Sequence, residues 1–176
     1  MSPAPEFSRI VKLDRLPAGE ERFAPDAGEC AALAARFDLP GIDRLEARLN
    51  FAPDGEAVIA RGTLHAAFRQ RCAVSDEPFP TRIEEPLAFR FVPALAVYSE
   101  EDEVEFDEDE PDEIPFEGAA IDVGEAIAQS FGLALDPYAT GPDADSARRD
   151  GGVVDEDAPR GALADALGAL SLKPRG

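Results

Sequence analysis

The stretch Val58-Ile-Ala-Arg-Gly-Thr-Leu-His-Ala-Ala-Phe-Arg-Gln-Arg-Cys72 decides the fold, because apolar and polar side chains alternate along most of its length. Successive side chains of a β-strand point to opposite faces, so this alternation predicts one long strand with a buried face and an exposed face. The expected buried face carries Val58, Ala60, Leu64, Ala66, Phe68 and Cys72. The expected solvent face carries Arg61, Thr63, His65, Arg69 and Arg71.

Two flanking segments alternate in the same way, and short turns join them to this strand. Pro53-Asp-Gly55 precedes the strand and Asp76-Glu-Pro78 follows it, and both have the composition of turns. We therefore predict three consecutive antiparallel strands at 44–52, 57–72 and 81–92. The inward residues of the two flanking strands are Leu45, Ala47, Leu49 and Phe51, and then Ile83, Leu87, Phe89 and Phe91.

A sheet with one apolar face needs a cover, and the spacing of apolar residues predicts two helices for this purpose. Asp26 is the expected N-cap of a helix over 27–37, and Asp122 is the expected N-cap of a helix over 121–134. Glu125 lies three residues after Asp122, which predicts a capping box. The expected fold class is therefore α+β, with an antiparallel sheet covered by two helices.

Charge divides the chain into two unlike halves. The net charge is −20, but residues 1–93 hold 15 acidic and 12 basic residues, whereas the rest hold 22 and 5. Eleven of the fourteen residues from 100 to 113 are acidic, and such a block cannot pack against itself. The predicted organisation is a flexible N-terminus (1–5), a domain (6–137) with a first strand at 7–13 and a mobile acidic loop at 99–114, a disordered linker (138–160) and a short C-terminal helix (161–172).

The sequence favours a cytoplasmic protein. The start, Met1-Ser-Pro-Ala-Pro-Glu6, lacks the basic and hydrophobic regions of a secretory signal, and no apolar run reaches the ~20 residues that span a bilayer. Cys30 and Cys72 form no spacing motif, so they are expected to be buried or idle thiols in a reducing compartment, with a disulfide or a reactive thiol as the alternative.

Neither catalysis nor metal binding has support in the sequence. The one histidine, His65, lies on the expected solvent face, no glycine-rich phosphate loop follows a strand, and the acidic block lacks the spacing of a calcium loop. We therefore predict no catalytic residue, no metal ligand and no cofactor. We also expect no membrane and no small-molecule substrate among its partners.

Arginines gather on the exposed faces of the three predicted strands. One interpretation is a solvated face with cross-strand pairs to Glu46 and Glu84. The other is a surface that contacts the phosphates of RNA or a binding partner. Aromatic residues do not interleave with the arginines, so base stacking is not expected. The candidate contact residues are Arg44, Arg48, Arg61, Arg69, Arg71, Arg82 and Arg90.

Three stretches of the chain form a set of motifs. The first contains Cys72-Ala-Val-Ser75 and Pro78-Phe79, followed by the alternating strand that ends at Pro93. The second runs from Ile121-Asp-Val-Gly-Glu125 to Leu133-Ala-Leu-Asp-Pro137, and the third runs from Gly161-Ala-Leu163 to Leu170-Ser-Leu-Lys173. Together these stretches resemble the YceD family of bacterial proteins, and the residues Gln70-Arg-Cys72 and Ile121-Asp-Val-Gly-Glu125 resemble its alphaproteobacterial branch. The positions that match family motifs are Cys72, Pro78, Phe79, Asp122 and Glu125.

The chain also departs from the family pattern. Many relatives have Cys-x-x-Cys where this chain has Cys72-Ala-Val-Ser75, and some carry more cysteines where this chain has Tyr138-Ala-Thr-Gly-Pro-Asp143. A zinc site is therefore not expected here, because one thiol remains where four ligands are needed.

The resemblance implies a non-catalytic role in the accumulation of large-subunit ribosomal RNA. Two ways of acting stay open. In the first, the arginines contact the RNA directly. In the second, the protein makes no RNA contact and acts as an acidic adaptor, or chaperone-like binder, of a basic ribosomal protein.

Overall fold

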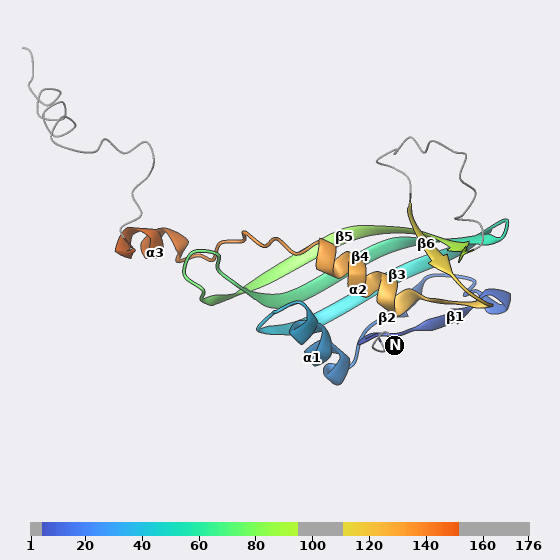
Figure 1. Ribbon diagram of the computed structural model, residues 1–176, viewed down its shortest axis with the longest axis horizontal. Helices are drawn as coiled ribbons and strands as arrows, with labels where there is room; N and C mark the ends of the chain where they lie inside the picture. Colours follow the sequence, from blue (N-terminus) through green and yellow to red (C-terminus); the bar gives the residue numbers. More distant parts are fainter. Residues whose placement is uncertain (1–4, 95–110, 152–176) are drawn as a thin grey trace, which may run out of the picture.

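The structure, a computed structural model, describes residues 5–94 and 111–151 and is built on one long, twisted sheet (Figure 1). Its five strands lie in the order β2-β3-β4-β5-β6. Neighbouring strands are antiparallel except for β5 and β6, which are parallel. The strands are β2 (Glu21–Phe23), β3 (Gly41–Asp54), β4 (Ala57–Arg71), β5 (Pro78–Pro93) and β6 (Asp112–Phe116).

The three central strands confirm the prediction from alternation. β3 and β4 form a hairpin whose turn contains Gly55, at a φ of 64° that glycine adopts at little cost. A side chain at Gly62 of β4 would collide with the backbone oxygen of Arg48 on β3, so only glycine fits at this position. The inward residues of all three strands form the core with Phe23 of β2.

A second, two-stranded sheet pairs β1 (Ile10–Lys12) with β7 (Ala120–Asp122). The strand predicted over 7–13 is therefore shorter than expected, and it does not join the main sheet. The chain continues from β1 into a short 3-10 helix, η1 (Leu13–Arg15). This small sheet ties the N-terminal segment to the start of the second long helix, which comes much later in the chain.

Two helices complete the core. α2 (Val123–Leu133) lies across one face of the main sheet, and α1 (Ala27–Arg36) lies beside β3 (Figure 1). Phe131 of α2 meets Phe68 of β4 edge-on, with ring centroids 5.3 Å apart, and it contacts Phe37 in the same way at 5.6 Å. The α+β class is confirmed, with a sheet that is mainly antiparallel.

Both predicted N-caps are present, but one capping box is incomplete. At α1, Asp26 accepts from the backbone N–H of Glu29 while the Glu29 carboxylate accepts from the N–H of Asp26. At α2, Asp122 accepts from the N–H groups of Gly124 and Glu125. The Glu125 carboxylate instead accepts hydrogen bonds from Arg36 of α1, because a charged guanidinium is a stronger hydrogen-bond donor than a backbone N–H.

Two segments differ from the predicted organisation. β6 begins at Asp112, inside the segment 99–114 that the sequence assigns to a loop, and it is held by pairing with β5. A further helix, α3 (Ala144–Asp150), lies within 138–160, where no regular structure was predicted. The predicted helix at 161–172 and most of the acidic block lie outside the described residues.

Candidate functional site

The face of β3, β4 and β5 turned away from α2 carries every arginine that the sequence singled out, and we call it the outer face. These arginines alternate with the buried residues of each strand, so all seven project to the same side. The register places Arg44 of β3, Ala67 of β4 and Arg82 of β5 in one row across the sheet. The small side chain between two arginines leaves a hollow, which Arg48 and His65 also line.

Glu46 lies at the centre of this arrangement and is bound by three arginines. Its Oε2 accepts from Arg22 at 2.8 Å and from Arg44 at 2.9 Å, and its Oε1 accepts from Nε of Arg48 at 3.0 Å. We call these four residues the Glu46 cluster. The Glu46 side chain is 2% exposed although it lies on the outer face, because the arginines cover it. The sequence pattern assigned Glu46 to solvent, and on this point it was wrong.

The arginines keep Glu46 charged. Hydrogen bonds from Arg44 and Arg22 outweigh the effect of burial and lower the pKa of Glu46 from 4.5 to about 2. One carboxylate balances one of the three guanidinium charges, so the cluster carries a net charge of about +2 at neutral pH. The arginine side chains remain 62%, 63% and 50% exposed for Arg22, Arg44 and Arg48, and solvent can therefore reach them.

The other predicted arginines are spread along the sheet. Arg69 and Arg71 lie 3.7 Å from the carboxylates of Asp43 and Asp76, and Nη1 of Arg71 also donates a hydrogen bond to the backbone oxygen of Asp76 at 3.3 Å. Arg61 is exposed and lies between Asn50 and Ala88 in the register.

Arg90 has a structural role. It binds Asp54 at 3.1 Å and also binds Glu113, so it joins β5 to the β3–β4 turn and to β6. Its pKa is raised by these two carboxylates, with Glu113 the larger cause. Arg90 is thus the least available of the seven predicted contact residues.

The cross-strand pairs of the alternative interpretation form in part. Glu46 pairs with arginines as described, but Glu84 lies 3.4 Å from Nδ1 of His65 rather than beside an arginine, and it is 73% exposed. The structure thus brings Arg44, Arg48 and Arg82 together around the hollow and leaves the remaining predicted arginines farther along the sheet.

Sequence reasoning missed Arg22, which is part of the Glu46 cluster. Arg22 lies on β2, whose three residues pair with β3 so that Arg22 is opposite Arg48. The only signal was the short run Glu21-Arg22-Phe23, in which the two charged residues are exposed and Phe23 is buried. Three residues are too few to establish a period of two.

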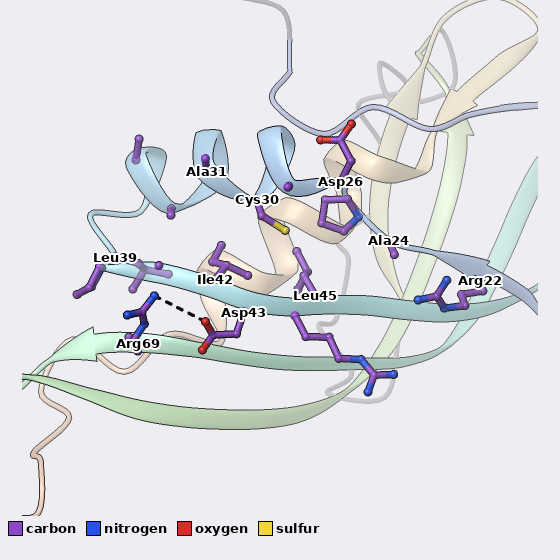
Figure 2. A pocket seen from close by; sticks show the side chains of 17 residues that line it. Arg22, Ala24, Asp26, Cys30, Ala31, Leu39, Ile42, Asp43, Leu45 and Arg69 are labelled. Carbon is purple, nitrogen blue, oxygen red and sulfur yellow. Dashed lines mark ion pairs between the residues drawn. The ribbon is translucent and has the colours of Figure 1, made fainter.

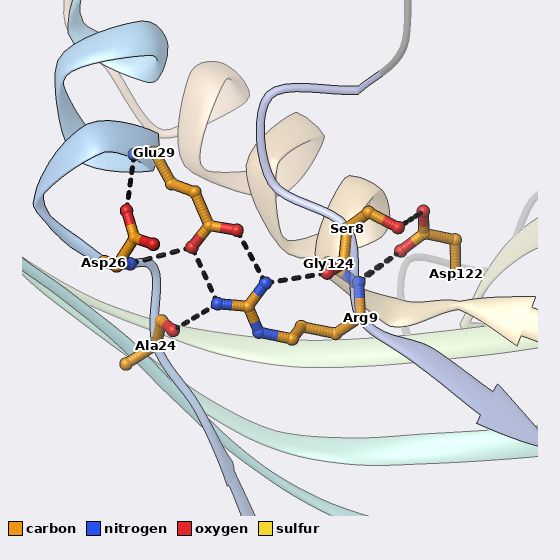
Figure 3. A network of polar contacts seen from close by, with 7 residues as sticks. All are labelled: Ser8, Arg9, Ala24, Asp26, Glu29, Asp122 and Gly124. Atoms are coloured by element: carbon orange, nitrogen blue, oxygen red, sulfur yellow. Dashed lines mark hydrogen bonds and ion pairs between the residues drawn. The ribbon is translucent and has the colours of Figure 1, made fainter.

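Two family-motif positions, Asp122 and Glu125, tie the start of α2 to the N-terminal segment and to α1, and Figure 3 shows the contacts of Asp122. Asp122 accepts from the Ser8 hydroxyl at 2.6 Å and from the N–H of Arg9 at 2.8 Å, besides capping α2. The Arg9 guanidinium in turn binds both carboxylate oxygens of Glu29 at 2.7 Å. Glu125 reaches α1 through Arg36, with both contacts at 3.1 Å.

The remaining motif positions shape the turn before β5. Cys72 is buried, and its Sγ accepts from the N–H of Val74 at 3.4 Å. The hydroxyl of Ser75, followed by the backbone at Gly141, lowers the pKa of Cys72 from 9.0 to about 7. Pro78 opens β5, and Phe79 packs so closely on Gly141 that a Cβ there would lie 3.1 Å from its ring. Within residues 5–94 and 111–151, no group of three or more His, Cys, Asp or Glu side chains is placed to hold a metal ion.

A second hollow lies between α1 and β3 (Figure 2). Its walls are mostly small or apolar and include Cys30, Ile42 and Leu45, with Arg22 at one end and Arg69 paired to Asp43 at the other. Burial is the first cause of a raised pKa for the Cys30 thiol. The raised pKa favours the protonated form of this thiol, which is the less reactive one.

Comparison with known protein families identifies the class to which this chain belongs. The family described as large ribosomal RNA subunit accumulation protein YceD matches residues 60–167, which include most of β4 and all of β5, β6 and α2. The chain therefore belongs to the YceD family. The search of curated proteins and the search of solved structures both returned no match. No helix in the described part of the chain is long and apolar enough to cross a membrane.

Proposed function

We propose that this protein supports the accumulation of large-subunit ribosomal RNA by binding RNA phosphates on its outer face. The family description supplies the biological role. We propose further that the protein acts in the bacterial cytoplasm by binding alone, without a catalytic step. The single observation that carries the proposed mode of binding is the convergence of Arg22, Arg44, Arg48 and Arg82 on one sheet face.

The charge distribution supports a local contact rather than general attraction. A chain with a net charge of −20 repels RNA as a whole, so binding depends on a surface where positive charge is concentrated. The outer face offers four arginines on β2, β3 and β5, and adjacent strands of a sheet lie about 4.8 Å apart. Guanidinium groups bind phosphate with two parallel hydrogen bonds, which suits them to this contact.

The outer face favours contacts with the RNA backbone over contacts with bases. Its out-facing residues on β3, β4 and β5 include no Phe, Tyr or Trp, whereas sheet proteins that read single-stranded RNA stack bases on such residues. Phosphate contacts position a protein on RNA without specifying a sequence. We therefore expect little discrimination among RNA sequences by this face alone.

A complementation experiment tests the proposal in cells. A bacterial strain that lacks the gene is supplied with the wild-type protein or with the triple variant Arg44→Ala, Arg48→Ala, Arg82→Ala, and large-subunit ribosomal RNA is quantified. We expect the triple variant to fail to restore the RNA level. The charge-matched control is Lys12→Ala, Arg15→Ala, Arg149→Ala, whose three exposed residues lie on other elements, and it should restore that level fully. Full restoration by the outer-face variant would contradict the proposal.

A second candidate function, the acidic adaptor, is favoured by a different groove. It lies between β5 and the C-terminal end of α2, and its titratable lining residues are Glu85, Asp112 and Asp136, all acidic. Leu133, which is 83% exposed, adds an apolar contact. A basic, partly apolar segment of a ribosomal protein would complement these walls.

The same complementation experiment separates the two functions. The variant Glu85→Lys, Asp136→Lys, Leu133→Ser changes the groove and leaves the outer face intact. If the adaptor function is the relevant one, this variant fails to restore the ribosomal RNA, whereas the outer-face triple variant restores it. The opposite pair of results supports direct RNA contact.

A further inference from the structure

The Glu46 cluster holds more positive charge than the fold requires. A buried carboxylate is costly unless it is paired and hydrogen-bonded, and one well-placed guanidinium can provide two hydrogen bonds to it. Here three arginines from two strands converge on the same carboxylate, with donor–acceptor distances of 2.8, 2.9 and 3.0 Å. The surplus suggests that the arrangement serves something outside the protein.

The geometry leaves most donors of these arginines directed elsewhere. A guanidinium carries five N–H donors. Arg22 and Arg44 each approach Glu46 through Nη2, and Arg48 approaches through Nε, while its Nη1 lies 3.8 Å from Glu20. All three side chains are at least half exposed, so their remaining N–H groups can bind a ligand without losing Glu46.

The cluster also borders the hollow on the outer face. Arg44, Glu46 and Arg48 line one side of this hollow, and Arg82 and the exposed Glu84 line the other. The floor includes Ala67, whose small side chain leaves space between Arg44 and Arg82. A group that enters the hollow therefore meets guanidinium groups on two sides. An anionic group with several acceptor oxygens, such as a phosphate, matches these donors best.

We propose that Glu46 is a positioning residue that fixes Arg22, Arg44 and Arg48 as a binding site for one backbone phosphate of RNA. The carboxylate holds the three long side chains in place, which lowers the conformational entropy lost when the phosphate binds. This inference rests on the proposed function, because it specifies how the outer face binds RNA. If only net charge mattered, removal of a negative charge from this face would strengthen RNA binding. We expect the opposite for Glu46: removal of its negative charge should weaken RNA binding.

The test compares two substitutions that change the net charge equally. Glu46→Gln and Glu84→Gln each remove one carboxylate from the outer face, but Glu84 is 73% exposed and binds none of the three arginines. Binding of a fluorescein-labelled single-stranded RNA oligonucleotide of mixed sequence is measured by fluorescence anisotropy at several salt concentrations. We expect Glu84→Gln to bind as tightly as the wild type or more tightly. We expect Glu46→Gln to bind about tenfold more weakly, the size of one charge-assisted hydrogen bond, and to show a smaller salt slope.

The possible outcomes separate this inference from the proposed function. If the wild type binds RNA and both substitutions strengthen binding equally, only net charge matters. The positioning role of Glu46 would then be wrong, whereas the proposed binding of RNA would remain. If the wild type shows no salt-dependent RNA binding, the proposed function itself is wrong and this inference with it.

A second variant tests the same site in case Glu46→Gln does not fold. Arg22 lies on the edge strand β2 with a side chain that is 62% exposed, so Arg22→Gln should fold normally. It should weaken RNA binding about as much as Glu46→Gln, and Arg22→Lys should recover only part of the loss, because lysine keeps the charge without the planar fork. Arg15→Gln, at an exposed position of η1, is the matched control and should have a smaller effect. Equal effects of Arg22→Gln and Arg15→Gln would overturn the site.

Discussion

At the scale of single residues, Glu46 links the stability of the fold to pH. Its pKa is about 2 in the folded protein, against 4.5 for an unperturbed glutamate, because the arginines favour its charged form. A lowered folded-state pKa adds stability at pH values above the unfolded-state pKa, where the carboxylate is charged in both states. That contribution decreases as the pH falls from 4.5 towards 2 and is absent below that range.

We therefore predict that Glu46→Gln lowers the free energy of unfolding more at pH 7 than at pH 3. The chain contains no tryptophan, so urea unfolding is best followed by far-UV circular dichroism. Glu84→Gln provides the control, because solvent screens a carboxylate that is 73% exposed and its removal should change stability little at either pH. A difference between Glu46→Gln and the wild type that stays constant from pH 7 to pH 3 would contradict this account.

At the scale of elements, one aspartate organises the start of α2. Asp122 accepts hydrogen bonds from Gly124, Glu125, Ser8 and Arg9, so it both caps the helix and attaches the N-terminal segment to it. Gly124 allows that attachment, since a Cβ there would lie 2.7 Å from the backbone of Phe7 and Arg9.

The two aspartate N-caps of α2 and α3 provide a direct comparison. Asp122→Ala should lower the free energy of unfolding by about 1–2 kcal/mol, the usual cost of losing an N-cap. Asp143→Ala should change it by no more than ~0.5 kcal/mol, because Asp143 precedes α3 without a side-chain hydrogen bond to it. Urea unfolding of both variants measures this difference, and equal costs would show that the cap of α2 is not the cause.

The elements also show which features of the fold can be predicted from sequence. The long strands β3, β4 and β5 were predictable, because each repeats the alternation of apolar and polar residues many times. β2 and β7 have three residues each and depend on pairing with distant strands, so local pattern cannot reveal them. β6 contains Pro115 and follows an acidic run, and both features argue against a strand until its partner β5 is known.

The candidate site was predictable only in part for the same reason. Alternation placed seven arginines on one face, and the structure confirms that placement. It could not distinguish Arg90, which two carboxylates hold, from Arg44 and Arg48, which border the hollow. The burial of Glu46 follows from three separate contacts, one of them from β2, and no pattern along a single strand encodes it.

At the scale of the whole molecule, positive and negative charge are segregated. The first 93 residues are nearly balanced, whereas the remaining residues hold 22 of the 37 acidic side chains. The acidic part repels RNA within a Debye length of ~8 Å at physiological salt, so it should suppress indiscriminate binding. On this account, the outer face binds RNA phosphates, and the rest of the molecule opposes contact elsewhere.

The salt dependence of RNA binding tests this central claim most directly. For single-stranded RNA, each phosphate that the protein neutralises contributes about 0.7 to the slope of log affinity against log salt concentration. The variant Arg44→Ala, Arg48→Ala, Arg82→Ala should have a slope smaller by about 0.7 for each phosphate that it no longer neutralises, and it should bind RNAs of different sequence more weakly to the same degree. The control Lys12→Ala, Arg15→Ala, Arg149→Ala should keep the wild-type slope. An unchanged slope in the outer-face variant would contradict the claim that this face binds RNA.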